Sequence, residues 1–185
     1  MKRISARAII IEGDKIGFMY RKKQNHSFYC LPGGKQEEDE KLEETVVREI
    51  KEEFGIDIEV VKKVYEFISE SAHQHFYLCR WVDGIFGTGE GEEFSGSSEK
   101  GYYEPRLVNV SHLKELHILP KKIAKQLRKD YEQYGPNLAD NVKILKDEKP
   151  LFKPLNIKKL KKTKKNNTKN TKKSIKTKNS KKQNS

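Results

Sequence analysis

Three glutamates on one predicted helical turn are the residues of this chain whose spacing is best suited to chemistry. Glu49, Glu52 and Glu53 are spaced i, i+3 and i+4, which puts side chains on one face of an α-helix. Like charges at this spacing repel each other by about 0.2–0.5 kcal/mol per pair. A bound dication would turn the repulsion into coordination, and a ligand set made of oxygen alone selects Mg²⁺ or Mn²⁺. The spacing therefore predicts a metal site.

A helix predicted from about Lys41 to Phe54 carries these three glutamates. The three glutamates border the apolar stripe of this helix, whereas a merely solvated acidic face would lie opposite it. We therefore favour a metal site over an acidic amphipathic helix without one. Gly55 stands where a glycine commonly ends a helix. The stripe repeats at every fourth position, as in a helix that packs one face on a core: Leu42, Val46, Ile50 and Phe54.

The residues around the predicted helix resemble the Nudix box. Every specified position is matched by Gly34, five residues, Glu40, seven residues and then Arg48-Glu49-Ile50-x-Glu52-Glu53-x-Gly55-Ile56. Leu31-Pro32-Gly33, which comes directly before, is also usual in that family. The resemblance covers about residues 3–135. It implies an α/β fold, a Nudix-type α/β/α sandwich with a mixed sheet, for a domain at residues 1–150.

The same resemblance implies an activity. Nudix hydrolases cleave the pyrophosphate linkage of a nucleoside diphosphate that is joined to another group, with Mg²⁺ and in some cases Mn²⁺. A modified nucleoside triphosphate, ADP-ribose or a similar small molecule is the expected substrate. By resemblance, Glu49, Glu52 and Glu53 are the metal ligands, and Glu52 or Glu53 also orients or deprotonates the attacking water.

Other acidic residues are additional candidates for this chemistry. Glu40 is either a further metal ligand or a helix-start residue, and some family members take their general base from a loop outside the box. Glu93 and Glu104 are candidates for that base. Arg48 and Gly55 are assigned structural roles, Arg48 by holding a carboxylate in place.

Four residues are candidates for binding substrate. Arg7 and Arg21 are on predicted early strands, from which a guanidinium could contact phosphate. Gly33 and Gly34 are expected to form a tight turn that leads into the helix, because glycine allows backbone conformations that other residues do not.

Alternating apolar and polar residues predict two antiparallel strand pairs. Residues 4–11 and 15–22 are expected to form a hairpin around a Gly-Asp turn. Residues 56–69 and 73–82 are expected to form the second pair. His73 and His75 share one face of the last of these strands, and without an identifiable further ligand we interpret them as surface or core histidines.

The second half of the chain is predicted to add one strand and one helix. The strand is expected at residues 105–110, with Ser111 as the cap of a short turn. A helix is expected to open at Pro120 and to stop at Gly135. One face of that helix is expected to carry Ile123, Leu127, Tyr131 and Tyr134.

The positive charge is concentrated at the C-terminus. The chain has 39 basic and 27 acidic residues and a net charge of +12, and residues 156–185 contain 13 lysines and no acidic residue. Such a segment buries too little apolar surface to offset an ordering cost of about 1–2 kcal/mol per residue. We predict a disordered tail at residues 151–185. It could contact RNA or DNA non-specifically, or be a low-complexity tail with no specific role.

Two cysteines are too few for a disulfide scaffold, and no apolar run approaches the roughly 18 residues of a membrane span. We therefore expect a cytoplasmic protein without a transmembrane segment. A catalytically silent nucleotide sensor with a Nudix fold, and a hydrolase of RNA ends aided by the basic tail, stay open as alternative functions. The sequence does not decide the substrate, the general base or the oligomeric state.

Overall fold

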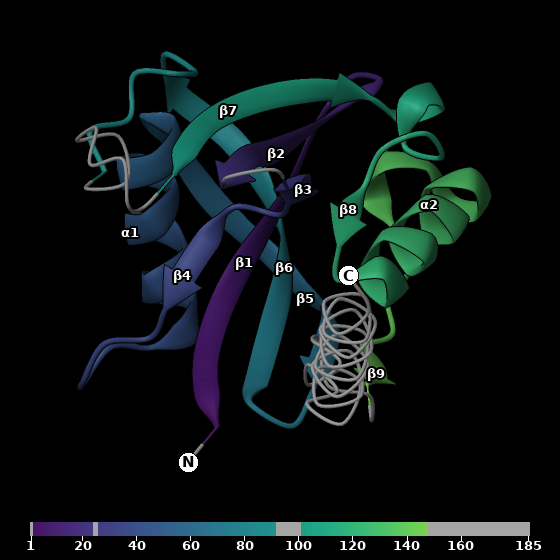
Figure 1. The fold of residues 1–185 in the computed structure, drawn as a ribbon, viewed down its shortest axis with the longest axis horizontal. Helices are drawn as coiled ribbons and strands as arrows, with labels where there is room; N and C mark the ends of the chain where they lie inside the picture. The colour runs from purple at the N-terminus through teal and green to yellow at the C-terminus, as the bar shows by residue number, and fades with distance from the viewer. Residues whose placement is uncertain (1, 24–25, 92–100, 148–185) are drawn as a thin grey trace, which may run out of the picture. The chain divides into compact units, whose positions relative to one another are not determined.

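The computed structural model describes residues 2–23, 26–91 and 101–147. The helices within them are α1 Leu42–Phe54 and α2 Lys121–Tyr134 (Figure 1), and neither has the length and apolarity needed to cross a membrane. The predicted tail lies outside the described residues, so its disorder and its nucleic-acid contact stay predictions. The strands are β1 Arg3–Glu12, β2 Lys15–Lys23, β3 His26–Cys30, β4 Gly33–Lys35, β5 Ile56–Ile68, β6 Ala72–Gly84, β7 Tyr102–Asn109, β8 Ile118–Leu119 and β9 Lys143–Lys146.

The described strands join in one mixed sheet. Its main path runs β8-β3-β2-β1-β6-β5-β9, with β4 paired to β1 and β7 paired to β2. β5 and β6 form the antiparallel pair that the sequence predicts. β1 runs parallel to β6, although the two strands are far apart in the chain. The sheet is therefore mixed, as the resemblance implied.

The two helices pack into two different apolar clusters, one on each face of the sheet. Neighbouring residues of β6 separate the faces, because Phe76 belongs to one cluster and Tyr77 to the other. Fully burying one large apolar side chain contributes about 1.5–3 kcal/mol, so each cluster fixes its helix firmly. This arrangement is the predicted α/β/α sandwich. Helix α1 contributes Val46, Ile50 and Phe54 to one cluster, and helix α2 contributes Ile123 and Leu127 to the other.

The predicted hairpin of β1 and β2 exists only at its turn. The two strands pair only through Ile11 with Ile16 and Glu12 with Lys15. Beyond the turn, β2 pairs instead with β7 along nearly its whole length and with β3 near its end. β1 meanwhile pairs with β6 and β4. The strands diverge because each finds longer partners elsewhere.

Gly33 and Gly34 do not form the predicted turn into the helix. They lie in the short strand β4, where Gly33 is opposite Arg7 and Gly34 is opposite Ala6 of β1. The chain reaches α1 only seven residues after Lys35. Both glycines are needed for another reason, the closeness of neighbouring atoms, which is described with the site.

The ends of α1 follow local rules. Glu44 in the first turn accepts a hydrogen bond from the backbone N–H of Lys41 at 2.8 Å, as in a capping box. Gly55 ends the helix with φ of 75°, a left-handed conformation that glycine adopts without steric cost.

The turn after β7 is capped differently from the prediction. A short 3-10 helix covers Val110–His112, and Asn109 caps it by accepting a hydrogen bond from the Ser111 backbone N–H at 2.9 Å. Ser111 was therefore the wrong cap. Its own hydroxyl also donates to the Asn109 side chain at 2.6 Å, so the asparagine oxygen, two residues earlier, accepts from both donors of Ser111.

Helix α2 begins after Pro120 and ends before Gly135, as predicted. Its apolar stripe is shorter than predicted, since Tyr134 is 46% exposed. The buried Asp130 instead fixes this part of the helix, because it accepts a hydrogen bond from the Tyr65 hydroxyl of β5 at 2.8 Å. Burial, followed by this hydrogen bond and the nearby negative charge, raises the pKa of Tyr65, so the hydroxyl stays the donor.

Candidate active site

The three predicted glutamates lie at the edge of the face that α1 buries. Ile50 and Phe54 pack fully into the core, and the glutamates flank them as the helical projection requires. Glu53 lies deepest, with 6% of its surface exposed. The Glu52 side chain is the most open of the three, with 49% exposed. The helix thus presents carboxylates that range from buried to solvent-facing along one edge.

Gly33 fixes the carboxylate of Glu53. Its backbone N–H donates to Glu53 Oε2 at 2.6 Å in a buried position. Gly33 has φ of 121°, and a Cβ there would lie 2.3 Å from the backbone oxygen of Ala6. No other residue fits this backbone without strain. The glycine therefore allows β4 to approach β1 closely enough for its amide to reach the helix.

Gly34 makes room for Glu49. A Cβ on Gly34 would lie 2.0 Å from Glu49 Oε1, so the carboxylate rests against bare backbone. Burial raises the pKa of Glu49, while the neighbouring positive charges of Arg48 and Arg7 oppose that rise. A carboxylate in this position gains from a cation close by.

Arg48 binds three of the predicted carboxylates at once. Its Nε and Nη2 bind the two oxygens of Glu40 at 2.9 and 3.1 Å. Its Nη1 lies 3.2 Å from Glu49 Oε1 and 3.3 Å from Glu52 Oε2. The hydrogen bonds from Arg48 lower the pKa of Glu40 to about 2. Glu40 is thus engaged by Arg48 and by the Thr45 hydroxyl at 2.8 Å.

The donor set fits a hard dication, although the carboxylates do not all converge in this structure. Within the described part of the chain, Glu49, Glu52 and Glu53 are not among the groups whose ligand atoms all lie within 4.8 Å of one another. Glu49 and Glu52 nevertheless share one cationic nitrogen of Arg48. These two carboxylates already hold one positive group between them, and the buried third carboxylate lies on the same edge of the helix. Such a set of oxygen ligands is what Mg²⁺ and Mn²⁺ prefer.

Arg7 and Arg21 extend from β1 and β2, and the charge of Arg7 acts on Glu49. Arg7 Nη1 donates to the carbonyl of Gly33 and, at 3.4 Å, to that of Leu31. Burial raises the pKa of the Cys30 thiol, the charges of Arg7 and Arg21 oppose that rise, and the charge of Glu53 adds to it. Cys30 therefore lies within electrostatic reach of both arginines and of the buried glutamate.

Aromatic side chains surround Arg21. Its guanidinium carbon lies 4.4 Å from the ring centre of Tyr103 and 5.9 Å from that of Phe28, and it also donates to the Tyr103 hydroxyl. A guanidinium over an aromatic ring is an attractive contact. Arg21 and these two rings combine positive charge with flat apolar surface, which suits a nucleotide.

The structure does not bring Glu104 to this side of the sheet. Glu104 pairs across the sheet with Tyr20, while its neighbour Tyr103 pairs with Arg21, and consecutive strand residues point to opposite faces. Arg106 binds the Glu104 carboxylate at 3.0 Å through Nε, and this contact lowers the pKa of Glu104. Glu93 lies outside the described residues, so its role stays a prediction.

The described start of the loop after β6 lies against the end of α1. Gly87 N–H donates to the Phe54 carbonyl at 2.9 Å, and Gly91 N–H donates to the Glu52 carbonyl at 2.9 Å. These bonds satisfy helix carbonyls that have no partner within the helix. The loop therefore fixes the turn that carries Glu52, a role for which the glycine-rich composition was the only sequence signal.

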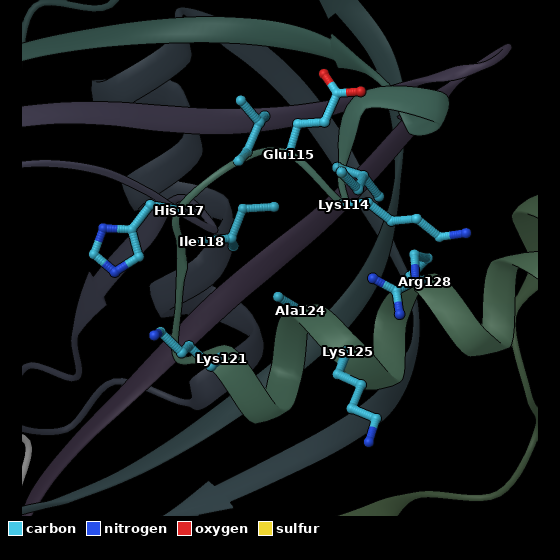
Figure 2. Close-up of a pocket in the computed structure, with 10 residues that line it drawn as sticks. Lys114, Glu115, His117, Ile118, Lys121, Ala124, Lys125 and Arg128 are labelled. Carbon is cyan, nitrogen blue, oxygen red and sulfur yellow. The ribbon is translucent and has the colours of Figure 1, made fainter.

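A separate pocket of about 450 Å³ lies between α2 and the residues before it. Figure 2 shows Lys121, Lys125 and Arg128 of α2 and Lys114 of the preceding segment around it, with Glu115 as its acidic residue. A rim of this charge favours an anion over a dication. No residue of the box lines this pocket, so the metal chemistry is not assigned to it.

Comparisons with known proteins agree with this fold. The NUDIX domain family model matches residues 1–127, so the class of protein is defined over most of the chain. The chain belongs to the Nudix family. The membership predicted from the box is confirmed, and with it the class of hydrolases at the level of the family. Among curated protein sequences no significant match is found.

Solved structures share the fold at low sequence identity. A NUDIX hydrolase from Nitrosomonas europaea matches with a TM-score of 0.61 and 18% identity, over 79% of this chain and 80% of that chain. An ADP-ribose pyrophosphatase from Streptococcus suis 89-1591 matches with a TM-score of 0.56 and 23% identity, over 80% and 100%. A UDP-X diphosphatase matches with a TM-score of 0.56 and 19% identity, over 77% and 67%.

Proposed function

We propose that this chain is a Mg²⁺-dependent hydrolase that cleaves the pyrophosphate linkage of a nucleoside diphosphate joined to another group. The observation that carries the proposal is the shared Arg48 nitrogen. It lies between Glu49 and Glu52, at 3.2 and 3.3 Å, on the helix edge that also holds the buried Glu53. These are the three carboxylates of the box, and the charge of Arg7 acts on one of them, Glu49.

Glu49, Glu52 and Glu53 would hold the metal, with Mn²⁺ as an alternative to Mg²⁺. When bound, the dication supplies positive charge that stabilises the charge developing on phosphate oxygens and acidifies an attacking water. Arg7 and Arg21 bind the diphosphate, which the carboxylates alone would repel. Tyr103, next to Arg21, offers a ring face on which a base can stack.

The chemical step needs one water and no further reactant. The water oxygen forms a bond to one phosphorus, the bond between that phosphorus and the bridging oxygen breaks, and the bridging oxygen leaves with the other phosphate. The products are a nucleoside monophosphate and the phosphate ester of the second group. Glu52 is the most solvent-facing of the three carboxylates, so it is best placed to orient the water and accept its proton. Glu53, held by Gly33, keeps a fixed position.

Arg21 with its aromatic neighbours and the solved relatives support a substrate class. The matched structures include an ADP-ribose pyrophosphatase and a UDP-X diphosphatase, which supports nucleoside diphosphates linked to a sugar as the first compounds to assay. Modified nucleoside triphosphates belong in the same panel. A contact with RNA through the tail stays a prediction.

The decisive experiment is a substrate panel with the purified full-length chain. Hydrolysis should require Mg²⁺ or Mn²⁺ and stop in EDTA. Glu53→Gln and Glu52→Gln should each lower kcat by about 100- to 1000-fold. Circular dichroism should show that both variants keep the fold. The exposed Glu70→Gln, on the turn between β5 and β6, is the matched control and should keep full activity. Tight nucleotide binding without any turnover would refute the proposed hydrolase activity and indicate a nucleotide sensor instead.

A further inference from the structure

Two adjacent strands bring together a second set of metal-binding side chains, away from the box. Glu66 of β5 is opposite His75 of β6. His73 comes two residues before His75 in β6 and therefore lies on the same face of that strand. The ligand atoms of these three residues all lie within 4.8 Å of one another. The two imidazole rings lie side by side, with centroids 4.1 Å apart. From these contacts we infer that Glu66, His73 and His75 form a site for a transition-metal dication of the Zn²⁺ type.

The distances suit such an ion. His73 Nε2 lies 3.0 Å from Glu66 Oε2, and His75 Nδ1 lies 3.5 Å from Glu66 Oε1. Zn²⁺ binds nitrogen and oxygen at about 2.0–2.1 Å in a tetrahedron, which places neighbouring ligand atoms about 3.3 Å apart. The two histidine–glutamate separations bracket that value, and all three ligand atoms lie within 4.8 Å of one another, so side-chain adjustment would be needed to centre an ion.

His75 supplies independent support. The residue is 7% exposed, and its buried Nδ1 makes no good hydrogen bond among the described residues, since Glu66 Oε1 lies 3.5 Å away. A buried polar nitrogen left unpaired is costly, and in native structures it calls for an explanation. An ion between the three side chains would satisfy this nitrogen, which a surface or core histidine leaves unexplained.

The ligand types separate this site from the box. Two imidazoles and one carboxylate suit Zn²⁺, Fe²⁺, Ni²⁺ or Cu²⁺, whereas Mg²⁺ prefers oxygen alone. Three protein ligands leave a fourth position for water or a small ligand. The site clips β5 to β6 close to their turn. Strand β1 separates it from the box, because Ala6 pairs with His75 on one side and with Gly34 on the other.

Lys63 competes with the ion. Its Nζ lies 2.8 Å from Glu66 Oε1, and a like charge beside a dication lowers affinity. The Lys63 side chain is 30% exposed, so it can turn toward solvent when an ion binds. This competition makes a substitution available that should improve the site.

The test is a Co²⁺ titration of the purified, untagged, metal-free full-length chain, followed by visible absorption, with excess Mg²⁺ present. One Co²⁺ should bind with the intense bands of a tetrahedral site, without the thiolate charge-transfer absorption that Cys30 or Cys79 would give. Zn²⁺ should reverse the spectrum. Thermal unfolding should shift upward with Zn²⁺, since ligands of the folded state stabilise it.

Variants decide whether the three residues are the ligands. His73→Ala and Glu66→Gln should each weaken Co²⁺ binding by about 100-fold or more, because losing even an outer-shell partner costs about 10- to 100-fold. Lys63→Met should tighten binding, and the exposed His112→Ala should leave it unchanged. Equal affinity in wild type, His73→Ala and Glu66→Gln would overturn the site. An unchanged affinity in Lys63→Met would contradict it as well, since Lys63 and the ion share Glu66.

Discussion

The substitution Gly34→Ala separates the geometry of the candidate active site from the stability of the fold. A Cβ at this position would lie 2.0 Å from Glu49 Oε1. Contacts between a methyl group and an oxygen normally begin at about 3.4 Å, so the carboxylate must move by about 1.4 Å. The atom that must move is the end of a flexible side chain, and the φ of Gly34 is not in the left-handed region. The fold should therefore survive.

The expected loss is in catalysis. A misplacement of about 1 Å can cost about 100-fold in rate, which corresponds to about 2.7 kcal/mol of transition-state stabilisation. Replacing an unstrained glycine with alanine changes folding stability by only about 0.4–1 kcal/mol. We therefore expect kcat/KM to fall about 100-fold and the Mg²⁺ concentration for half-maximal rate to rise, while the thermal midpoint moves by only a few degrees.

A double-mutant cycle identifies the cause. Glu49→Asp shortens the side chain by one methylene and withdraws its oxygens from Gly34. Gly34→Ala should therefore cost much less in the Glu49→Asp background than in wild type, and the difference is the coupling between the two positions. The reasoning is refuted if Gly34→Ala keeps wild-type kcat/KM and Mg²⁺ dependence, or if its cost is the same in both backgrounds.

Three further predictions follow from the same region. Gly33→Ala should destabilise the fold by about 1–3 kcal/mol or more, seen in urea unfolding, because its φ is 121° and its clash is with the backbone of Ala6. Glu40 has its pKa lowered to about 2 by Arg48, so its contribution to stability is present above about pH 4.3 and is lost as the pH falls toward 2; the stability gap between wild type and Glu40→Gln should shrink over that range. Arg21→Lys should raise KM severalfold and leave kcat unchanged, because lysine stacks poorly on an aromatic ring; a fall in kcat alone would contradict a binding role.

Helix α1 was predictable because its information is local. The apolar stripe, the capping glutamate Glu44 and the terminal Gly55 lie within the helix or next to it, and the observed bounds, Leu42–Phe54, agree with the prediction to within one residue. The β5–β6 pair was predictable for a similar reason, since its strands are joined by a short turn. In both cases the residues that decide the structure are neighbours in the chain.

Elements that depend on distant partners were not predictable in the same way. Strand β4 has three residues, two of them glycines, and exists because β1 lies beside it. A strand propensity for Gly33-Gly34 is absent, so only the fold shows that the glycines are needed for close approach and not for a turn. The parallel pairing of β1 with β6 likewise joins segments whose separation the sequence does not reveal.

The partner of the histidine pair was missed for a more specific reason. Between Val60 and Tyr65, β5 contains irregularities that shift its register against β6. Counting back from the turn places Glu66 opposite His75, whereas counting forward from the Ile56–Gly84 pair without the shifts places Glu66 opposite Gln74. The bulges therefore turn a strand that looks regular in sequence into one that brings a carboxylate to the two imidazoles.

A basic side chain stands in each of the two carboxylate sets. Arg48 Nη1 lies between Glu49 and Glu52, and Lys63 Nζ lies on Glu66. A dication that enters either set must displace or repel that charge, so the affinity measured for the metal is the difference between two competing interactions. The two cases diverge in what holds the basic residue. Arg48 is anchored by two hydrogen bonds to Glu40, so it can release one carboxylate and stay in place. Lys63 forms its ion pair with Glu66 alone among the described residues. Removing Lys63 should thus improve metal binding by Glu66. Removing Arg48 should instead leave Glu40 without its partner, disturb the start of the helix and weaken metal binding at the box.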